Sequence, residues 1–272
     1  METEKGEILS ERGVFSTLNS YLISRGMKAN GMFWATGLLA ALHSPFINNI
    51  TSAMIFGKSI KEISRNHQYQ HIALCNLIIT SNSGVWFLGT ATSLMVVLAG
   101  KISIIGLLTL FPAGIIGWAA SAAALHIFYI RRLSGELIDS TPDEVKIKRG
   151  GTNVMLLAQL QKVEWNTLLF FIGIISGVAA LNHVGWLPYI SRLFEVFSPT
   201  TVNVALGVIS GVLDNVPVEA AALMVGVGGS LTVIGSAAGI MVMSIDKSYS
   251  FGTHLKFLPA ILTNFFVSLG VW

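Results

Sequence analysis

Long apolar runs without charged side chains are the feature that most restricts how this chain can fold. Residues 32–56, 72–98 and 102–130 contain no Asp, Glu, Lys or Arg. A helix of about 20 such residues crosses the hydrocarbon core of a bilayer. Only 11% of the chain is charged, against about 25% in soluble domains, which is too little to cover a water-facing surface. We therefore predict an all-α integral membrane protein.

The basic residues lie between the apolar runs. Thirteen of the 17 Lys and Arg residues fall within residues 1–28, 57–71 and 131–164. Such clusters are typical of cytoplasmic loops under the positive-inside rule, and they make nucleic acid an unexpected partner. Within the second cluster, His67 and His71 have the i, i+4 spacing of a metal pair. The sequence offers them no third ligand, so no metal is expected beyond a transported ion.

Several apolar runs are interrupted by polar or helix-breaking residues. Residues 32–56 break between Ser44 and Asn49, and residues 72–98 break between Ser81 and Gly84. Each arm of the first run has about 10 residues, half of what a span needs, so a re-entrant hairpin is predicted there. Unwound backbone within a bilayer must be buried in protein or line a wet cavity. Residues 102–130 are expected to span without a break, with a kink at Pro112.

The breaks recur along the chain in the same order. Residues 44–50 resemble 210–216, and residues 89–95 resemble 235–241. With the basic clusters in the cytoplasm, the two halves insert with opposite sense. This pattern predicts an inverted-repeat transporter with re-entrant hairpins and discontinuous transmembrane helices. The expected organisation is residues 1–130, an amphipathic helix plus the first half, then a cytoplasmic loop at 131–164, and a shortened second half at 165–272.

Candidate ion-binding residues carry a carboxylate, amide or hydroxyl group near a break, where freed carbonyls and side-chain oxygens can coordinate an ion. They are Asp214, Asn215, Asn48, Asn49, Thr90, Thr92, Ser230, Ser236 and Glu219. Asp214 is the strongest candidate, because a carboxylate in an apolar run is costly and usually faces a cavity. The asparagines could instead form turns, the hydroxyls could cap helices, and Glu219 could face the polar rim.

The runs SGVLDNVPVEAA (210–221) and GGSLTVIGSAAGIMVM (228–243) resemble second-half signatures of NhaD-type sodium/proton antiporters. FWATGLLAALHSPFINNITSAM (33–54) and GTATSLMVV (89–97) resemble the first-half signatures. These antiporters belong to the ion-transporter superfamily, together with arsenite and citrate permeases. The resemblance implies an inward-facing and an outward-facing hairpin, and elevator-like exchange of Na⁺ or Li⁺ for H⁺.

The chain also departs from the pattern of this family. Asn48 and Thr90 stand where the family usually has Asp, and Glu219 stands where it has an apolar residue. The resemblance therefore leaves Asp214 as the main protonatable group. It indicates a truncated or divergent member, so two alternatives stay open. One is an arsenite- or carboxylate-type permease of the same superfamily, and the other is a non-transporting remnant.

The remaining expectations concern chemistry and surroundings. No Gly-x-Ser-x-Gly, HExxH or P-loop motif occurs, so an enzyme is not expected, and no cofactor is expected besides transported Na⁺ and H⁺. The bilayer is the expected partner, and a homodimer stays open. The family resemblance implies a bacterial inner membrane or an organelle membrane of bacterial origin.

Overall fold

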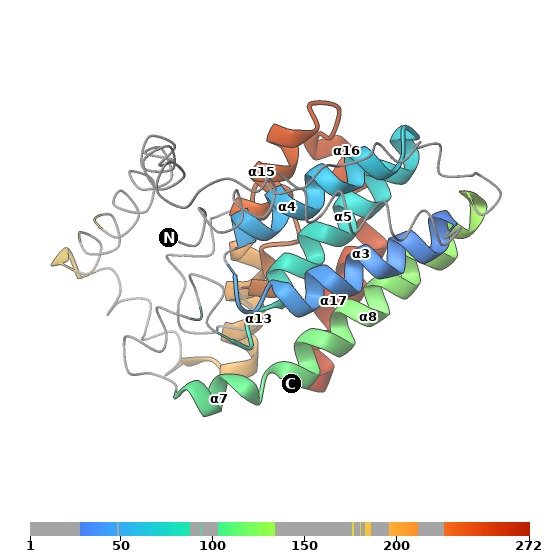
Figure 1. The fold of residues 1–272 in the computed structure, drawn as a ribbon. Helices are drawn as coiled ribbons and strands as arrows, with labels where there is room; N and C mark the ends of the chain where they lie inside the picture. The colour runs from blue at the N-terminus through green and yellow to red at the C-terminus, as the bar shows by residue number, and fades with distance from the viewer. Residues whose placement is uncertain are drawn as a thin grey trace, which may run out of the picture.

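A computed structural model of the chain describes residues 28–47, 49–87, 93, 103–133, 176, 180, 183–185, 196–211 and 226–272. These residues form helices and no strand (Figure 1). The helices are α3 (Ala29–His43), α4 (Asn49–Ile63), α5 (His67–Ser83), α7 (Ile104–Leu108), α8 (Phe111–Phe128), η1 (Ile130–Leu133), α13 (Pro199–Ser210), α15 (Ala237–Ile245), α16 (Phe251–Leu255) and α17 (Leu258–Val271). The all-α prediction is confirmed for this part of the chain.

Helix α5 lies at the centre of the bundle. It contacts α3, α4, α8 and α15, and every residue from Ile72 to Ser83 is buried. Its amino end is fixed by Asn66, whose Oδ1 accepts hydrogen bonds from the backbone N–H groups of Gln68 and Tyr69. Such an N-cap satisfies donors that have no partner within the helix. The polar residues in the last two turns of α5 lie inside the protein because this whole stretch is buried.

Helices α3 and α4 form a helix–turn–helix hairpin packed against α5. Helix α3 ends at His43 and α4 begins at Asn49, as the predicted break requires. Each helix has 15 residues, a length of about 22 Å at 1.5 Å per residue, which is less than a hydrocarbon core. The hairpin itself is thus present, and its re-entrant insertion in a membrane stays a prediction.

The run predicted as one uninterrupted span is divided in two. Helices α7 and α8 are separated by Thr109 and Leu110, and Pro112 lies in the first turn of α8. Proline is favoured there because its missing N–H would have no helical partner, so it starts α8 instead of kinking one helix. The stretch Ile104–Phe128 is still the one candidate span, by length and hydropathy, among the described residues.

Helix α17 packs along α8 in the opposite direction. The Tyr129 hydroxyl donates to the Lys256 carbonyl at 2.8 Å, and at the other end the Ser268 hydroxyl donates to the Ala113 carbonyl at 3.2 Å. The outward faces of the two helices carry large apolar side chains, including Ile127 of α8 and Phe266 of α17, which are 58% and 59% exposed. An exposed apolar surface of this kind is what lipid would cover.

Charged residues distant in sequence meet at one end of the bundle. The Lys61 Nζ lies 3.1 Å from the Asp246 Oδ2, in the turn after α15. Burial raises the pKa of Asp246, but hydrogen bonds from Ser248 and the ion pair with Lys61 outweigh this and hold the pKa below its usual value. Lys247 and Lys256 lie beside this turn in the sequence. The cytoplasmic side of these lysines stays a prediction from the positive-inside rule.

Candidate functional site

The helix breaks predicted from sequence meet inside the bundle. At the tip of the α3–α4 hairpin, the Ser44 hydroxyl donates to the carbonyl of Ser81 at 2.8 Å. A Cβ added to Gly84, the residue that ends α5, would lie 2.6 Å from the Ser44 Oγ. The absence of a side chain at residue 84 therefore lets the hairpin tip lie against the carboxyl end of α5.

Asn82 connects this junction to the second half of the chain. Its Oδ1 accepts a hydrogen bond from the Asn49 Nδ2 at 3.2 Å. Its Nδ2 donates to the Oγ of Ser236 at 2.9 Å and to the Oγ of Ser230 at 3.1 Å. Asn82, Ser230 and Ser236 are fully or almost fully buried. We call Asn49, Asn82, Ser230 and Ser236 the Asn82 cluster.

An irregular segment, residues 229–236, supplies the two serines. It packs closely on the carboxyl end of α13, where the Thr232 hydroxyl donates to the Gly211 carbonyl. A Cβ at Gly235 would lie 2.7 Å from that same oxygen, and one at Gly228 would overlap the carbonyl of Gly207. Glycine is needed at both positions because the two backbones approach each other directly.

The ends of several helices surround the Asn82 cluster. Helices α3, α5 and α13 end beside it with His43, Ser83 and Ser210, while α4 and α15 begin beside it with Asn49 and Ala237. Carboxyl ends carry partial negative charge and amino ends carry partial positive charge. The carboxyl ends of α3, α5 and α13 therefore favour a cation beside the cluster, and the amino ends of α4 and α15 favour negatively charged groups.

A second chain of hydrogen bonds leads from Ser230 toward the turn after α15. The Ser230 carbonyl lies 2.9 Å from the Nε2 of His254, and the His254 Nδ1 lies 2.8 Å from the Tyr249 hydroxyl. Because a carbonyl only accepts, Nε2 carries a hydrogen, and the Nδ1 of a neutral ring accepts from Tyr249. His254 and Tyr249 are both buried, so these bonds tie residues 249–254 to the cluster.

Three of the predicted site residues are brought together, namely Asn49, Ser230 and Ser236. The other six, Asp214, Asn215, Glu219, Asn48, Thr90 and Thr92, lie outside the described residues. Asn82, the residue on which the cluster converges, is missing from the predicted set. Asn82 is the one side-chain amide within the predicted break at residues 81–84. That position was the signal that could have identified it.

The cluster offers oxygen atoms in a space shielded from solvent. The Asn49 Oδ1 is buried and accepts no hydrogen bond from a described residue. The Asn49 side chain is joined to the Oδ1 of Asn82, and Asn82 is joined in turn to the Oγ atoms of Ser230 and Ser236. Amide and hydroxyl oxygens are hard ligands that can replace the water around an alkali cation. None of the four residues of the cluster has a titratable side chain.

Comparison with known proteins gives consistent matches along the chain. The family model described as "Citrate transporter" matches residues 6–244. The Na(+)/H(+) antiporter NhaD of Alkalimonas amylolytica is 27% identical over 97% of this chain and 73% of its own length. The protein of the same name from Vibrio cholerae is 27% identical over 96% of this chain and 74% of its own length. These relatives are transporters and not enzymes by name.

The relatives are longer within the matched stretch. The match to the Alkalimonas amylolytica protein extends over 358 residues, whereas this chain has 272. The Na(+)/H(+) antiporter NhaD of Vibrio parahaemolyticus, 26% identical over 94% of this chain and 84% of its own length, shows the same excess. Segments present in these proteins therefore have no counterpart here. No solved structure matches the chain.

Proposed function

The chain belongs to the citrate transporter family, and from this membership we propose that it exchanges Na⁺ for H⁺ across a membrane. The proteins named NhaD that resemble it over nearly its whole length support this choice within the family. The ion would bind at the Asn82 cluster. Transport would need no cofactor, since oxygen ligands and a protonatable group suffice for coupled exchange.

The convergence of the helix breaks on Asn82 is the observation that carries the proposal. Asn49 comes from the hairpin, Asn82 from the end of α5, and Ser236 from the start of α15. Each break frees backbone carbonyls that a continuous helix would have used. Together with the side-chain oxygens, these carbonyls could strip Na⁺ or Li⁺ of water at the level of the broken helices.

Proton coupling requires a group that titrates, and we assign it to Asp214. The residue follows Gly211 closely in the sequence, and Gly211 packs on the segment that carries Ser230 and Ser236. An ionised carboxylate attracts Na⁺, and a protonated one does not, so the two ions would compete. Asn48, Asn215, Thr90 and Thr92 would add neutral ligands, and Glu219 a second acid.

Movement of the site would follow the inverted-repeat arrangement predicted from sequence. Residues 1–130 and 165–272 would form the two halves, joined by a cytoplasmic loop at 131–164, and the α3–α4 hairpin would enter the membrane from the cytoplasm. We place the protein in a bacterial inner membrane or in an organelle membrane of bacterial origin, where a proton gradient can drive exchange. A homodimer is compatible with this arrangement.

Reconstitution in liposomes tests the function. An imposed Na⁺ gradient should move protons, read as a pH change by a fluorescent dye inside the vesicles. Asn82→Ala and Asp214→Asn should each remove this flux. Asn76→Ala is the matched control, because Asn76 is a buried amide on the same helix that bonds Trp118 and not the cluster. Flux that is absent from the parent protein, or unchanged in both site variants, would refute the proposal.

One observation favours a second candidate, transport of a carboxylate. The described part of the Asn82 cluster has no acidic side chain, and the amino ends of α4 and α15 lie beside it. Positive helix ends bind carboxylates in other transporters of broken-helix design. Uptake of labelled citrate by the same liposomes separates the two. Citrate uptake without Na⁺-driven proton movement would replace the antiport proposal.

A further inference from the structure

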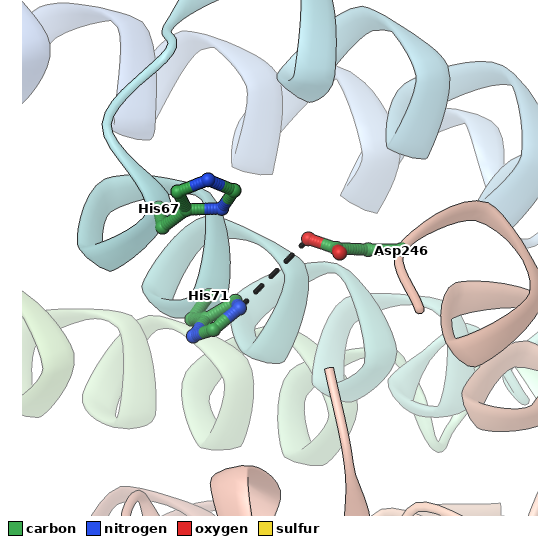
Figure 2. A group of neighbouring side chains, drawn as sticks. All are labelled: His67, His71 and Asp246. Carbon is green, nitrogen blue, oxygen red and sulfur yellow. Dashed lines mark ion pairs between the residues drawn. The ribbon is translucent and has the colours of Figure 1, made fainter. Parts of the chain in front are cut away.

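A second group of polar residues, separate from the Asn82 cluster, lies at the amino end of α5. It consists of His67 and His71 of α5 and of Asp246, which follows α15. Each residue offers one metal-ligating atom, and these atoms lie within 4.8 Å of one another. In Figure 2 the two imidazoles project from α5, and Asp246 reaches toward them from the segment after α15. Two imidazole nitrogens and one carboxylate oxygen form a common ligand set for a divalent transition metal.

The sequence sets the two histidines on one face of α5. Residues at i and i+4 are neighbours on a helix surface. Asn66 caps the helix, so its first turn, which contains His67, has a defined start. The centres of the two imidazole rings are 6.4 Å apart. His67 is exposed and His71 is half-buried, so an ion could reach the pair from solvent.

Asp246 is held with one oxygen facing the histidines. The N–H and hydroxyl of Ser248 donate to its Oδ1 at 3.0 and 2.7 Å. Its Oδ2 is buried, pairs with the Lys61 ammonium, and lies 3.8 Å from the His71 Nε2. Ligand hydrogen bonds of this kind fix the orientation of a metal-binding carboxylate. The carboxylate is therefore oriented before any ion arrives.

A cation already occupies the open side of the carboxylate. The Lys61 Nζ lies 3.1 Å from the Asp246 Oδ2, and 30% of the Lys61 side chain is exposed. A lysine on a flexible stem can turn into solvent at small cost. The positive charge of Lys61 shows that this position attracts cations, and it makes Lys61 a competitor for any metal.

We propose that His67, His71 and Asp246 bind a divalent transition-metal ion of the Zn²⁺ type in place of the Lys61 ammonium. Ligand bonds of about 2.0–2.2 Å put the donor atoms of a tetrahedral site about 3.4 Å apart, so rotation of side chains would close the present spacing. Ca²⁺ and Mg²⁺ prefer all-oxygen sites, and Cu⁺ prefers sulfur. The fourth position would hold water.

Such an ion would fasten α5 to α15 at the end remote from the Asn82 cluster. Helix α15 is already joined to α5 through Ser236 and Asn82, and Asp246 directly follows its last residue. A metal bridge would hold both ends of α15 against α5. The expected consequence, inhibition of transport by the metal, rests on the proposed function, whereas binding itself does not.

Titration with Co²⁺ tests the site directly. The full chain, purified in detergent without a polyhistidine tag, should take up one Co²⁺ per chain with visible absorption of a low-coordinate ion, and Zn²⁺ should displace it. His71→Ala and Asp246→Asn should each weaken binding by more than about 100-fold, the upper range for loss of a second-shell group. His67→Ala repeats the test on an exposed residue.

Two further variants give the proposal a specific signature. Lys61→Met should strengthen Co²⁺ binding about 5-fold, because it removes a competitor with an ion-pair energy of about 1 kcal/mol. His183→Ala, which removes an exposed histidine elsewhere, should change nothing. Absence of saturable Co²⁺ binding, binding that survives His67→Ala and His71→Ala, or weaker binding in Lys61→Met would overturn the proposal. All of these are read without any transport measurement.

Discussion

The two ends of α5 solve the problem of placing polar groups in an apolar protein in different ways. The carboxyl end carries Asn82, buried and bonded to neutral amides and hydroxyls. The amino end carries His71 beside the ion pair of Lys61 and Asp246, at the edge of the bundle. We call the carboxyl end of α5 the inner end and its amino end the outer end. A charge at the inner end would lose its hydration, whereas at the outer end Lys61 and His67 still contact solvent.

This difference teaches which interactions each end can tolerate losing. At the inner end, each polar atom depends on a protein partner, because no water replaces a lost bond. At the outer end, solvent and salt screen the charges, so single contacts contribute little to stability. We therefore expect substitutions to become less damaging from the inner end to the outer end of α5, and the following changes test that order.

The largest effect should come from Gly228→Ala at the inner end. The new methyl group would overlap the Gly207 carbonyl and lie 2.5 Å from the Ser210 Oγ. Overpacking against backbone should cost about 3 kcal/mol in the free energy of unfolding, measured by denaturation in detergent. Gly252→Ala, at the outer end, is the matched control, because the nearest atom to its Cβ is the Ser250 Oγ at 3.9 Å. Equal losses in both would contradict the comparison.

Asn82→Ala should rank second. It leaves the Asn49 Nδ2 without its Asn82 partner and removes the donor to both serines, at a cost of about 2 kcal/mol. Because the bonds are neutral and shielded, the loss should be the same at low and high salt. Thermal unfolding at two salt concentrations measures this. A loss that shrinks with added salt would mean that the inner end is wetter than its burial indicates.

Tyr249→Phe tests the link between the two ends and should cost about 1 kcal/mol. It removes the hydroxyl that lies 2.8 Å from the His254 Nδ1 and leaves a buried nitrogen without that partner. Tyr129→Phe is the control, since its hydroxyl bonds the Lys256 carbonyl at an exposed position, where water can substitute. Thermal unfolding of both variants should show a loss of stability for Tyr249→Phe that is smaller than the loss for Asn82→Ala and larger than the loss for Lys61→Met.

Lys61→Met should have the smallest effect, below about 1 kcal/mol, and high salt should remove it. Since the pKa of Asp246 is lowered in the folded protein, its ionised form stabilises the fold at neutral pH. That contribution is lost as the pH falls through the folded-state pKa. Unfolding measured against pH should therefore show the parent and Lys61→Met converging in acid. A difference that persists there would point to packing of the lysine stem instead.

Much of the fold followed from the sequence because spans and breaks are local features. The absence of charges in 102–130 predicted a candidate span, and Ser44 and Asn49 marked the ends of two helices. Pro112 was misread as a kink. A proline fits both inside a bent helix and at the start of a new one, and the preceding turn at Thr109 decides between them.

The sites were less accessible to the same reasoning. Asn49, Ser230 and Ser236 were predicted one by one from their positions beside breaks, but nothing local joined them to Asn82. The metal pair of His67 and His71 was visible as an i, i+4 spacing, yet its third ligand, Asp246, is far along the chain. Helical periodicity reports neighbours within one turn or two, and it carries no information on distant partners.

By itself the sequence determined that this chain builds a helical membrane protein with interrupted helices, because hydropathy and helix-breaking residues act over short stretches of chain. Only the tertiary structure decided which breaks meet, that Asn82 is their common partner, and that Asp246 faces two histidines. Those outcomes depend on packing between helices far apart in sequence. That packing is set by close backbone approach at glycines such as Gly228 and Gly235 and by the hydrogen-bond partners that most buried polar groups need.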